Sequence, residues 1–156
     1  MASVSPASIR QRVAAAINSA LGGSGYHQSV WAPPLFPDAP GAQDTRTLAH
    51  KGYAVFLSTT SMDTEHRHRP AKGAYAMTMV HVVFGWRLRA DAQVADYDAA
   101  LGAELAVVAA VMGMTQTPSL RPRLVRVAQR AVAPASDGAF YVGRLDFEFR
   151  HIYAEA

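Results

Sequence analysis

The chain has 156 residues, half of them hydrophobic, which is enough for one domain, residues 1–156, with a core that needs no metal or disulfide. It has no cysteine, which excludes disulfide frameworks, thiolate zinc sites and cysteine nucleophiles. No stretch of about 18 residues is apolar enough to span a bilayer, and the net charge of +3 comes from scattered arginines rather than a basic run, so we expect a soluble protein without a membrane segment.

A helix of roughly four turns is predicted near the N-terminus. Ser5 can cap its first turn, and Pro6 suits the first helical position, where a backbone N–H has no partner. Gly22 and Gly23 end the pattern, as glycine often does at a helix C-terminus. Four large apolar residues recur at every fourth position and are predicted to form the buried face: Ile9, Val13, Ile17 and Leu21.

The segment 24–50 is rich in proline and has almost no periodicity, so it is predicted to be an extended connection. Its large apolar residues argue against a solvated linker. We expect Trp31 and Phe36 to anchor this segment on the body of the domain or on a neighbouring subunit. The stretch 31–32 is a candidate for a short strand.

Two strands separated by a polar loop follow. Residues 53–59 indicate a buried strand, because aromatic and β-branched residues run almost without a polar break. The loop 60–73 is polar and charged and is predicted to protrude. Residues 75–88 then alternate between an apolar face and a mixed face, and the mixed face includes His81 and Arg87.

The spacing changes to that of a second amphipathic helix after the long strand. Asp91 is placed to cap its start, and Gly113 stands where a left-handed terminator is expected. Six apolar residues three or four positions apart are predicted to form its buried stripe: Val94, Tyr97, Leu101, Leu105, Val108 and Met112.

Residues 123–132 form the next predicted strand, and 137–138 (Asp-Gly) is a strong turn signal before a last strand. Arg126 and Arg130 are predicted to share one strand face and to pair with Asp146 or Glu148. The last strand alternates most clearly, with Tyr141, Gly143, Leu145, Phe147, Phe149, His151 and Tyr153 on one face and Arg144, Asp146, Glu148 and Arg150 on the other. The order of elements predicts an α+β fold, a mainly antiparallel sheet with both helices packed on one face.

The sequence contains no clear catalytic set. Four residues of the polar loop have side chains that can ligate a first-row metal: Asp63, Glu65, His66 and His68. A solvated loop is the favoured interpretation, because nothing nearby would hold these ligands in place. His81 and His151 are candidate general bases, but serines such as Ser58 lie in no nucleophile-elbow pattern, so structural histidines are favoured. We therefore expect no enzyme, cofactor or metal site.

Three stretches share the order and pattern of a known family: IRQRVAAAINSAL, YAMTMVHVVFGWRLRADAQVADYDAALGAELAVVAAVMGM and RLVRVAQRAVAPASDGAFYVGRLDFEFR. Together they resemble the tail terminator (tail completion) proteins of long-tailed bacteriophages. The resemblance implies a structural virion protein, assembled in the host cytoplasm, that forms a ring, typically a hexamer, at the head-proximal end of the tail. Such a ring caps the tail tube, ends tube polymerisation and joins the tail to the head connector, without catalytic residues.

The resemblance also implies partners: further copies of the chain, the tail tube protein, a head connector or adaptor protein, and DNA that passes through the ring without sequence-specific binding. A ring contact closes by rotation, so different faces of one chain must be complementary. We assign the partner interface to eight residues of the two long connections: Trp31, Phe36, Glu65, His66, Arg67, His68, Arg69 and Lys72. A head–tail connector or adaptor subunit is the nearest alternative. A small α+β ligand-binding, enzymatic or metal-dependent domain that uses His66, His68 or His81 is another.

Overall fold

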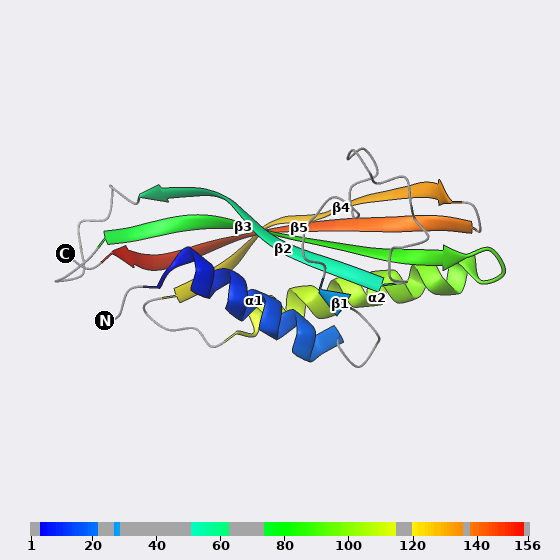
Figure 1. Cartoon of the computed structure of the whole chain (residues 1–156), viewed down its shortest axis with the longest axis horizontal. Coiled ribbons are helices and arrows are strands. Elements are labelled where there is room, and N and C mark those ends of the chain that lie inside the picture. The colour runs from blue at the N-terminus through cyan, green and yellow to red at the C-terminus, as the bar shows by residue number, and fades with distance from the viewer. Residues whose placement is uncertain are drawn as a thin grey trace.

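The computed structural model describes residues 4–21, 27–28, 51–62, 74–114, 120–135 and 138–154. Within these ranges the elements are α1 (Pro6–Leu21), β1 (His27–Gln28), β2 (Lys51–Met62), β3 (Ala74–Arg89), α2 (Gln93–Met112), β4 (Leu120–Ala135) and β5 (Gly138–Ala154). The strands form one sheet in the order β1-β2-β3-β5-β4, in which β1 is parallel to β2 and the other neighbours are antiparallel. Figure 1 shows both helices on the same side of this sheet, so the predicted α+β architecture is confirmed.

The main core lies between the two helices and one face of the sheet. The predicted stripe of α1 is confirmed, because Ile9, Val13 and Ile17 are fully buried and Leu21 is nearly so. Alternate residues of the long strands meet this stripe, which follows from the two-residue period of a strand. The helix-facing residues of β3 and β5 include Val80, Val82, Phe84, Tyr141, Leu145, Phe147 and Phe149.

The buried face of α2 agrees only in part with the prediction, because Tyr97, Val108 and Met112 are partly buried and pack against the core, whereas two other members of the predicted stripe do not. Val94 and Leu105 are 76% and 70% exposed. The residues buried on this helix are instead Asp96, Ala100, Ala103, Glu104, Val107 and Val111. Apolar residues surround almost the whole helix, so their spacing does not identify the side that faces the sheet.

Two buried carboxylates fasten α2 to neighbouring strands. Asp96 accepts hydrogen bonds from the backbone N–H of Arg89 at 2.9 Å and from the Arg89 guanidinium at 3.0 Å. Glu104 accepts two hydrogen bonds from Arg130, at 2.6 and 2.8 Å, and one from the Tyr141 hydroxyl at 3.0 Å. Charge-assisted and bidentate bonds of this kind are among the stronger ones in proteins. They explain why α2 turns a face with acids toward the sheet.

The ends of α2 also differ from the prediction. The N-cap is Ala92, with no side-chain capping bond, so the assignment of Asp91 as the cap is wrong. Asp96 in the first turn bonds Arg89 instead. Gly113 does end the helix, but its φ of −84° is right-handed, so the expected left-handed terminator is wrong.

β2, β3 and β4 are longer than predicted, and each of the three antiparallel pairings contains a register shift. β2 reaches Met62, so residues 60–62 of the predicted polar loop are strand. In β4 the register shifts between Arg126 and Gln129, and as a result Arg126 lies opposite Asp146 whereas Arg130 lies opposite Gly143. The register therefore does not place the two arginines at equivalent positions opposite β5, and Arg130 pairs with Glu104 of α2 rather than with an acid of β5.

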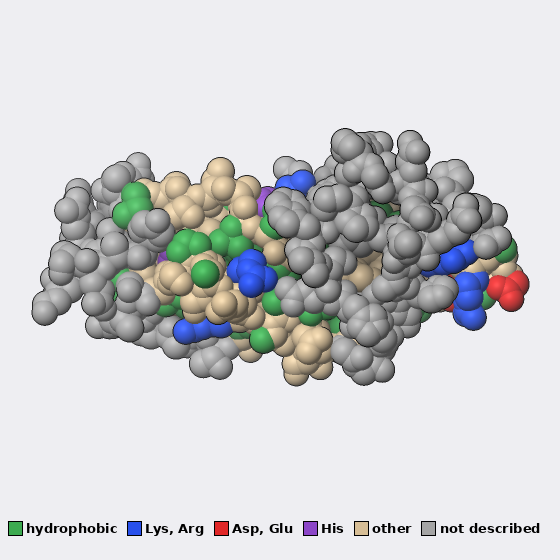
Figure 2. Space-filling view, viewed as in Figure 1, with side chains coloured by type: hydrophobic (Ala, Val, Ile, Leu, Met, Phe, Trp, Pro, Cys, Tyr) green, Lys and Arg blue, Asp and Glu red, His purple; other side chains and the backbone are tan. Residues whose placement is uncertain are grey.

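The alternation predicted for the last strand is confirmed where side chains are described. Leu145, Phe147, Phe149 and His151 are fully buried on the side of the helices. Figure 2 shows the molecule from the same side as Figure 1, with hydrophobic and basic side chains together over α1.

Neither described helix is both long and apolar enough to cross a membrane.

Candidate functional site

The predicted interface cannot be located among the described residues. All eight of its members lie outside them, namely Trp31, Phe36, Glu65, His66, Arg67, His68, Arg69 and Lys72. The metal candidate Asp63 and the short strand expected at 31–32 lie outside them as well. Within the part of the chain that the structure describes, no three potential metal ligands come together. The candidate sites therefore come from the sheet and the helices.

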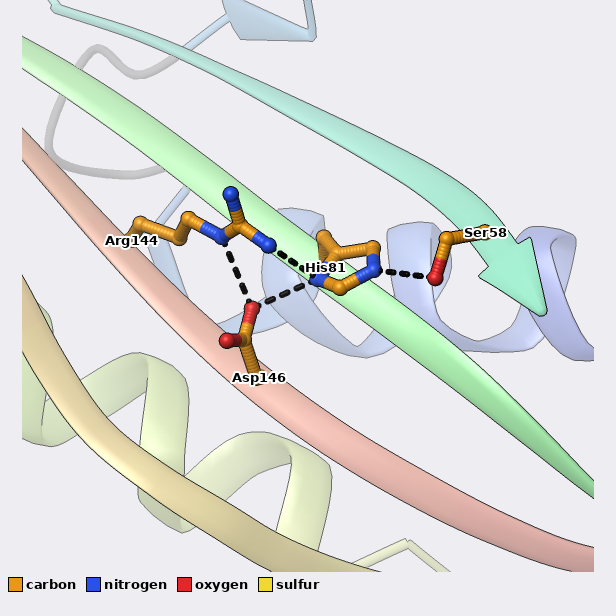
Figure 3. Close-up of polar contacts among 4 residues, drawn as sticks. All are labelled: Ser58, His81, Arg144 and Asp146. Carbon is orange, nitrogen blue, oxygen red and sulfur yellow. Dashed lines mark hydrogen bonds and ion pairs between the residues drawn. The ribbon is translucent and has the colours of Figure 1, made fainter.

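A polar cluster lies on the sheet face turned away from the helices (Figure 3). It contains Ser58 of β2, His81 of β3, and Arg144 and Asp146 of β5. His81 and Asp146 are directly opposite each other in register, and Phe56, two residues before Ser58, is opposite His81 on the other side. Ser58 therefore lies on the same face of the sheet as His81, and its hydroxyl contacts the His81 imidazole diagonally across the two strands.

The bonds in this cluster are short. His81 Nδ1 lies 2.5 Å from Asp146 Oδ1, and His81 Nε2 lies 2.6 Å from Ser58 Oγ. Arg144 Nε donates to the same Oδ1 at 2.9 Å, and Arg144 Nη2 lies 3.0 Å from His81 Nδ1. An ionised Asp146 can only accept, so the Nδ1–H of His81 donates to it and Nε2 accepts from the Ser58 hydroxyl. In this tautomer the approach of Arg144 Nη2 to Nδ1 is not a hydrogen bond, because both groups are donors, and Arg144 acts through Asp146.

The electrostatics keep Asp146 ionised. Burial alone would raise the pKa of its carboxyl, but the hydrogen bonds from His81 and Arg144 outweigh burial and hold that pKa below its usual range. The His81 and Asp146 side chains are only 7% exposed, whereas Ser58 is exposed. The result is a hydroxyl at the surface with an oriented imidazole and a carboxylate behind it.

This order of groups is that of a nucleophile, a base and an orienting carboxylate. Ser58 and Thr59 also fall between the paired residues Leu57 and Thr60, at a register shift of β2, and such irregularities are common beside active sites. Arg144 is an added member, because it shares the carboxylate that orients His81. A largely buried polar network of this kind also serves to fix the sheet register.

His151, the other candidate base, occupies a different network on the side of the helices. Its Nδ1 donates to the Val4 carbonyl oxygen at 2.9 Å, and its Nε2 accepts from the Thr78 hydroxyl at 2.8 Å. Thr78 in turn contacts the Thr60 hydroxyl at 2.8 Å. Burial lowers the pKa of His151. This histidine therefore holds the start of the described chain to β5.

A second candidate site is the exposed side of α2, which we call the α2 outer face. It consists of Gln93, Val94, Ala95, Asp98, Ala99, Gly102, Leu105 and Ala109, all exposed. Val94 and Leu105 are eleven residues apart and therefore lie on nearly the same side of the helix. Large apolar side chains gathered on an exposed helix face commonly mark a contact with another protein.

The exposed side of α1 contains an open hollow of about 250 Å³, which we call the α1 hollow. It is lined by Arg10, Gln11, Ala14, Ala15 and Asn18. These residues follow helical spacing, so the hollow runs along the helix for more than two turns. The surface of α1 thus offers a recess with a basic rim.

The edge strand β4 is less suited to pairing with another chain. Pro122 and Pro134 have no N–H to donate, and Arg121 and Arg123 are exposed charges on the same strand. Proline and charge are the usual means by which natural proteins prevent edge-to-edge association. Among the described surfaces, the helices are therefore better placed for self-association than the sheet edge.

No protein-family model and no curated protein matches this sequence.

Proposed function

We propose that this chain is a structural subunit of a phage tail, a tail terminator that assembles with its own copies into a hexameric ring. In this proposal the ring caps the head-proximal end of the tail tube, ends tube polymerisation and joins the tail to the head connector. Its partners are neighbouring copies, the tail tube protein and the connector or adaptor protein. DNA passes through the central hole without sequence-specific binding.

The observation that carries this proposal is the α2 outer face. Val94 and Leu105 expose most of their side chains to solvent on a helix that has no Lys or Arg. Full burial of a side chain of this type contributes about 1.5 to 3 kcal/mol, so covering both with a partner is favourable.

Native mass measurement tests the proposal directly. A hexamer of the 16.7-kDa chain has a mass of about 100 kDa, and electron microscopy of the same sample should show a ring with a central hole. Tail tubes mixed with the protein should carry such rings at one end. A connector subunit, the nearest alternative, would bind the head structure and leave tube ends bare. A monomer that fails to cap tubes would refute the proposal.

The polar cluster on the opposite sheet face supports a second candidate function, a serine-dependent acyl or phosphonyl transfer. The supporting observation is the sequence of contacts from Ser58 to His81 to Asp146, at 2.6 and 2.5 Å. In such a reaction Ser58 Oγ attacks the electrophile while His81 Nε2 takes the hydroxyl proton.

A fluorophosphonate probe tests this second candidate. The Ser58 Oγ–P bond forms, the P–F bond breaks, fluoride leaves, and the proton moves to His81. The adduct should map to Ser58 by peptide mass and disappear in Ser58→Ala and His81→Asn. Ser61→Ala is the matched control, because Ser61 is an exposed serine of the same strand. An absence of labelling in the wild-type chain would leave the cluster a structural network and reject the enzymatic reading.

A further inference from the structure

We infer that neighbouring copies in the ring meet helix to helix, with the α2 outer face of one copy on α1 of the next. In this contact Leu105 enters the α1 hollow, and Asp98 faces Arg10. The inference rests on the proposed ring and specifies which surfaces form it. The occupant of the α2 outer face is therefore a second copy of this chain.

The charges of the two helices are complementary. α1 contains Arg10 and Arg12 and no acid, whereas α2 contains three acids and no Lys or Arg. Two of those acids are buried and paired, Asp96 with Arg89 and Glu104 with Arg130. Asp98 is the acid that remains exposed on the α2 outer face.

This distribution favours a contact between α1 of one copy and α2 of another over a contact between two like helices. Two α2 outer faces brought together would place one Asp98 near another, and two α1 surfaces would do the same with their arginines. Like charges that meet across an interface disfavour that pairing, while opposite charges favour it and set its register. A contact between two different faces of the same chain forms a closed ring when its rotation closes.

The dimensions of the two surfaces also agree. Asp98 and Leu105 are seven residues apart on nearly the same side of α2, a separation of about 10 Å along the helix axis. Arg10 and Asn18, at the two ends of the α1 hollow, are eight residues apart, or about 12 Å. Gly102 lies between Asp98 and Leu105, and the space around its Cα is open. A partner helix can therefore approach closely between the ionic contact and the apolar one.

Charge reversal tests the contact. Asp98→Arg and Arg10→Glu should each weaken subunit association by about tenfold or more, and the double variant should recover most of this loss. Arg12→Glu and Asp91→Arg are the matched controls. Arg12 is two residues from Arg10 and points to another side of α1, and Asp91 is an exposed acid that precedes α2. The ring population is measured by native mass spectrometry.

A mixing experiment separates this contact from an effect within one chain. Asp98→Arg spoils only the α2 side of a subunit, and Arg10→Glu spoils only the α1 side. An equimolar mixture of the two single variants should therefore form rings of alternating subunits, although neither variant does so alone. Leu105→Glu should abolish rings without rescue, whereas Val132→Glu, at an exposed apolar residue of β4, should leave them intact.

The outcomes distinguish the two proposals. If the wild-type chain forms no ring, the proposed function fails. If the wild type forms rings and Leu105→Glu, Asp98→Arg and Arg10→Glu leave them unchanged, the ring stands and the helix-to-helix contact is wrong. Circular dichroism and urea unfolding of each variant establish that it is folded, as expected for substitutions at residues whose side chains face solvent.

Discussion

Replacing Gly143 by alanine should destabilise the protein through a single buried contact. Gly143 of β5 lies opposite Phe84 of β3, and the phenyl ring of Phe84 covers the glycine. An added Cβ would lie 2.9 Å from each Cε atom of that ring and closer still to Cζ. Phe84 is fully buried and packs against the Tyr141 ring at a centroid distance of 5.9 Å, so it has little room to move.

Overpacking of a filled core costs about 1 to 3 kcal/mol, and we expect Gly143→Ala to lie at the upper end of this range. Urea unfolding measures the loss as a lower midpoint. Gly102→Ala is the matched control, because nothing lies within 4 Å of the added Cβ in the middle of α2. It should raise stability by about 0.5 to 1 kcal/mol.

Phe84→Leu combined with Gly143→Ala tests the cause. Each single change lowers stability, but the smaller side chain relieves the clash, so the double variant should lose less than the two single variants together. If Gly143→Ala unfolds at the wild-type midpoint, or if the two effects simply add, the phenyl ring does not cover Gly143 and the packing argument is wrong.

Two further predictions concern the buried polar groups. Asp96→Ala should lower the free energy of unfolding by about 1 to 3 kcal/mol, because the backbone N–H and guanidinium of Arg89 lose their acceptor. The control is Asp91→Ala, at an exposed acid, which should leave the free energy of unfolding nearly unchanged in the same urea assay. Burial lowers the pKa of His151 in the folded protein. As the pH drops below 6.5, the unfolded chain therefore takes up a proton more readily than the folded protein does, and the free energy of unfolding should fall. The urea midpoint of the wild type should fall as the pH is lowered, and that of His151→Gln should fall less. An equal dependence on pH in the two proteins would mean that other groups cause it. The lowered pKa of Asp146 acts in a separate range, since its contribution is lost only as the pH falls below 3.8.

The parts of the fold that the sequence predicts are those with a strict period and a strong contrast. From Arg144 to Arg150 of β5, large apolar or aromatic residues alternate with charged ones, so the two faces of this stretch follow from the pleat alone. The first helix is similar, since its large apolar residues recur every four positions among small and polar ones. In α2 that contrast is missing, and the buried side is decided by two ion pairs whose arginines lie on other elements.

The polar cluster depends on register, which alternation does not determine. The mixed face of β3 identifies the side on which His81 lies, but not the residue opposite it on β5. β3 and β5 are separated in the chain by α2 and β4, so no turn sets their alignment. The same limit applies to Arg130, whose partner is a helix residue rather than the predicted acid of the neighbouring strand. Ser58 becomes a candidate nucleophile only when the pairing of His81 with Asp146 is known.

The position of β5 has a consequence for synthesis on the ribosome. β5 lies between β3 and β4 in the sheet although it follows both in the chain. The described part of β4 therefore has no strand neighbour until β5 has been translated, and the Val4 N–H, just before α1, has no access to its acceptor, the Ile152 carbonyl, until then. Pairing between segments far apart in sequence is slow. The sheet of a nascent chain therefore stays incomplete until the last strand has left the ribosome.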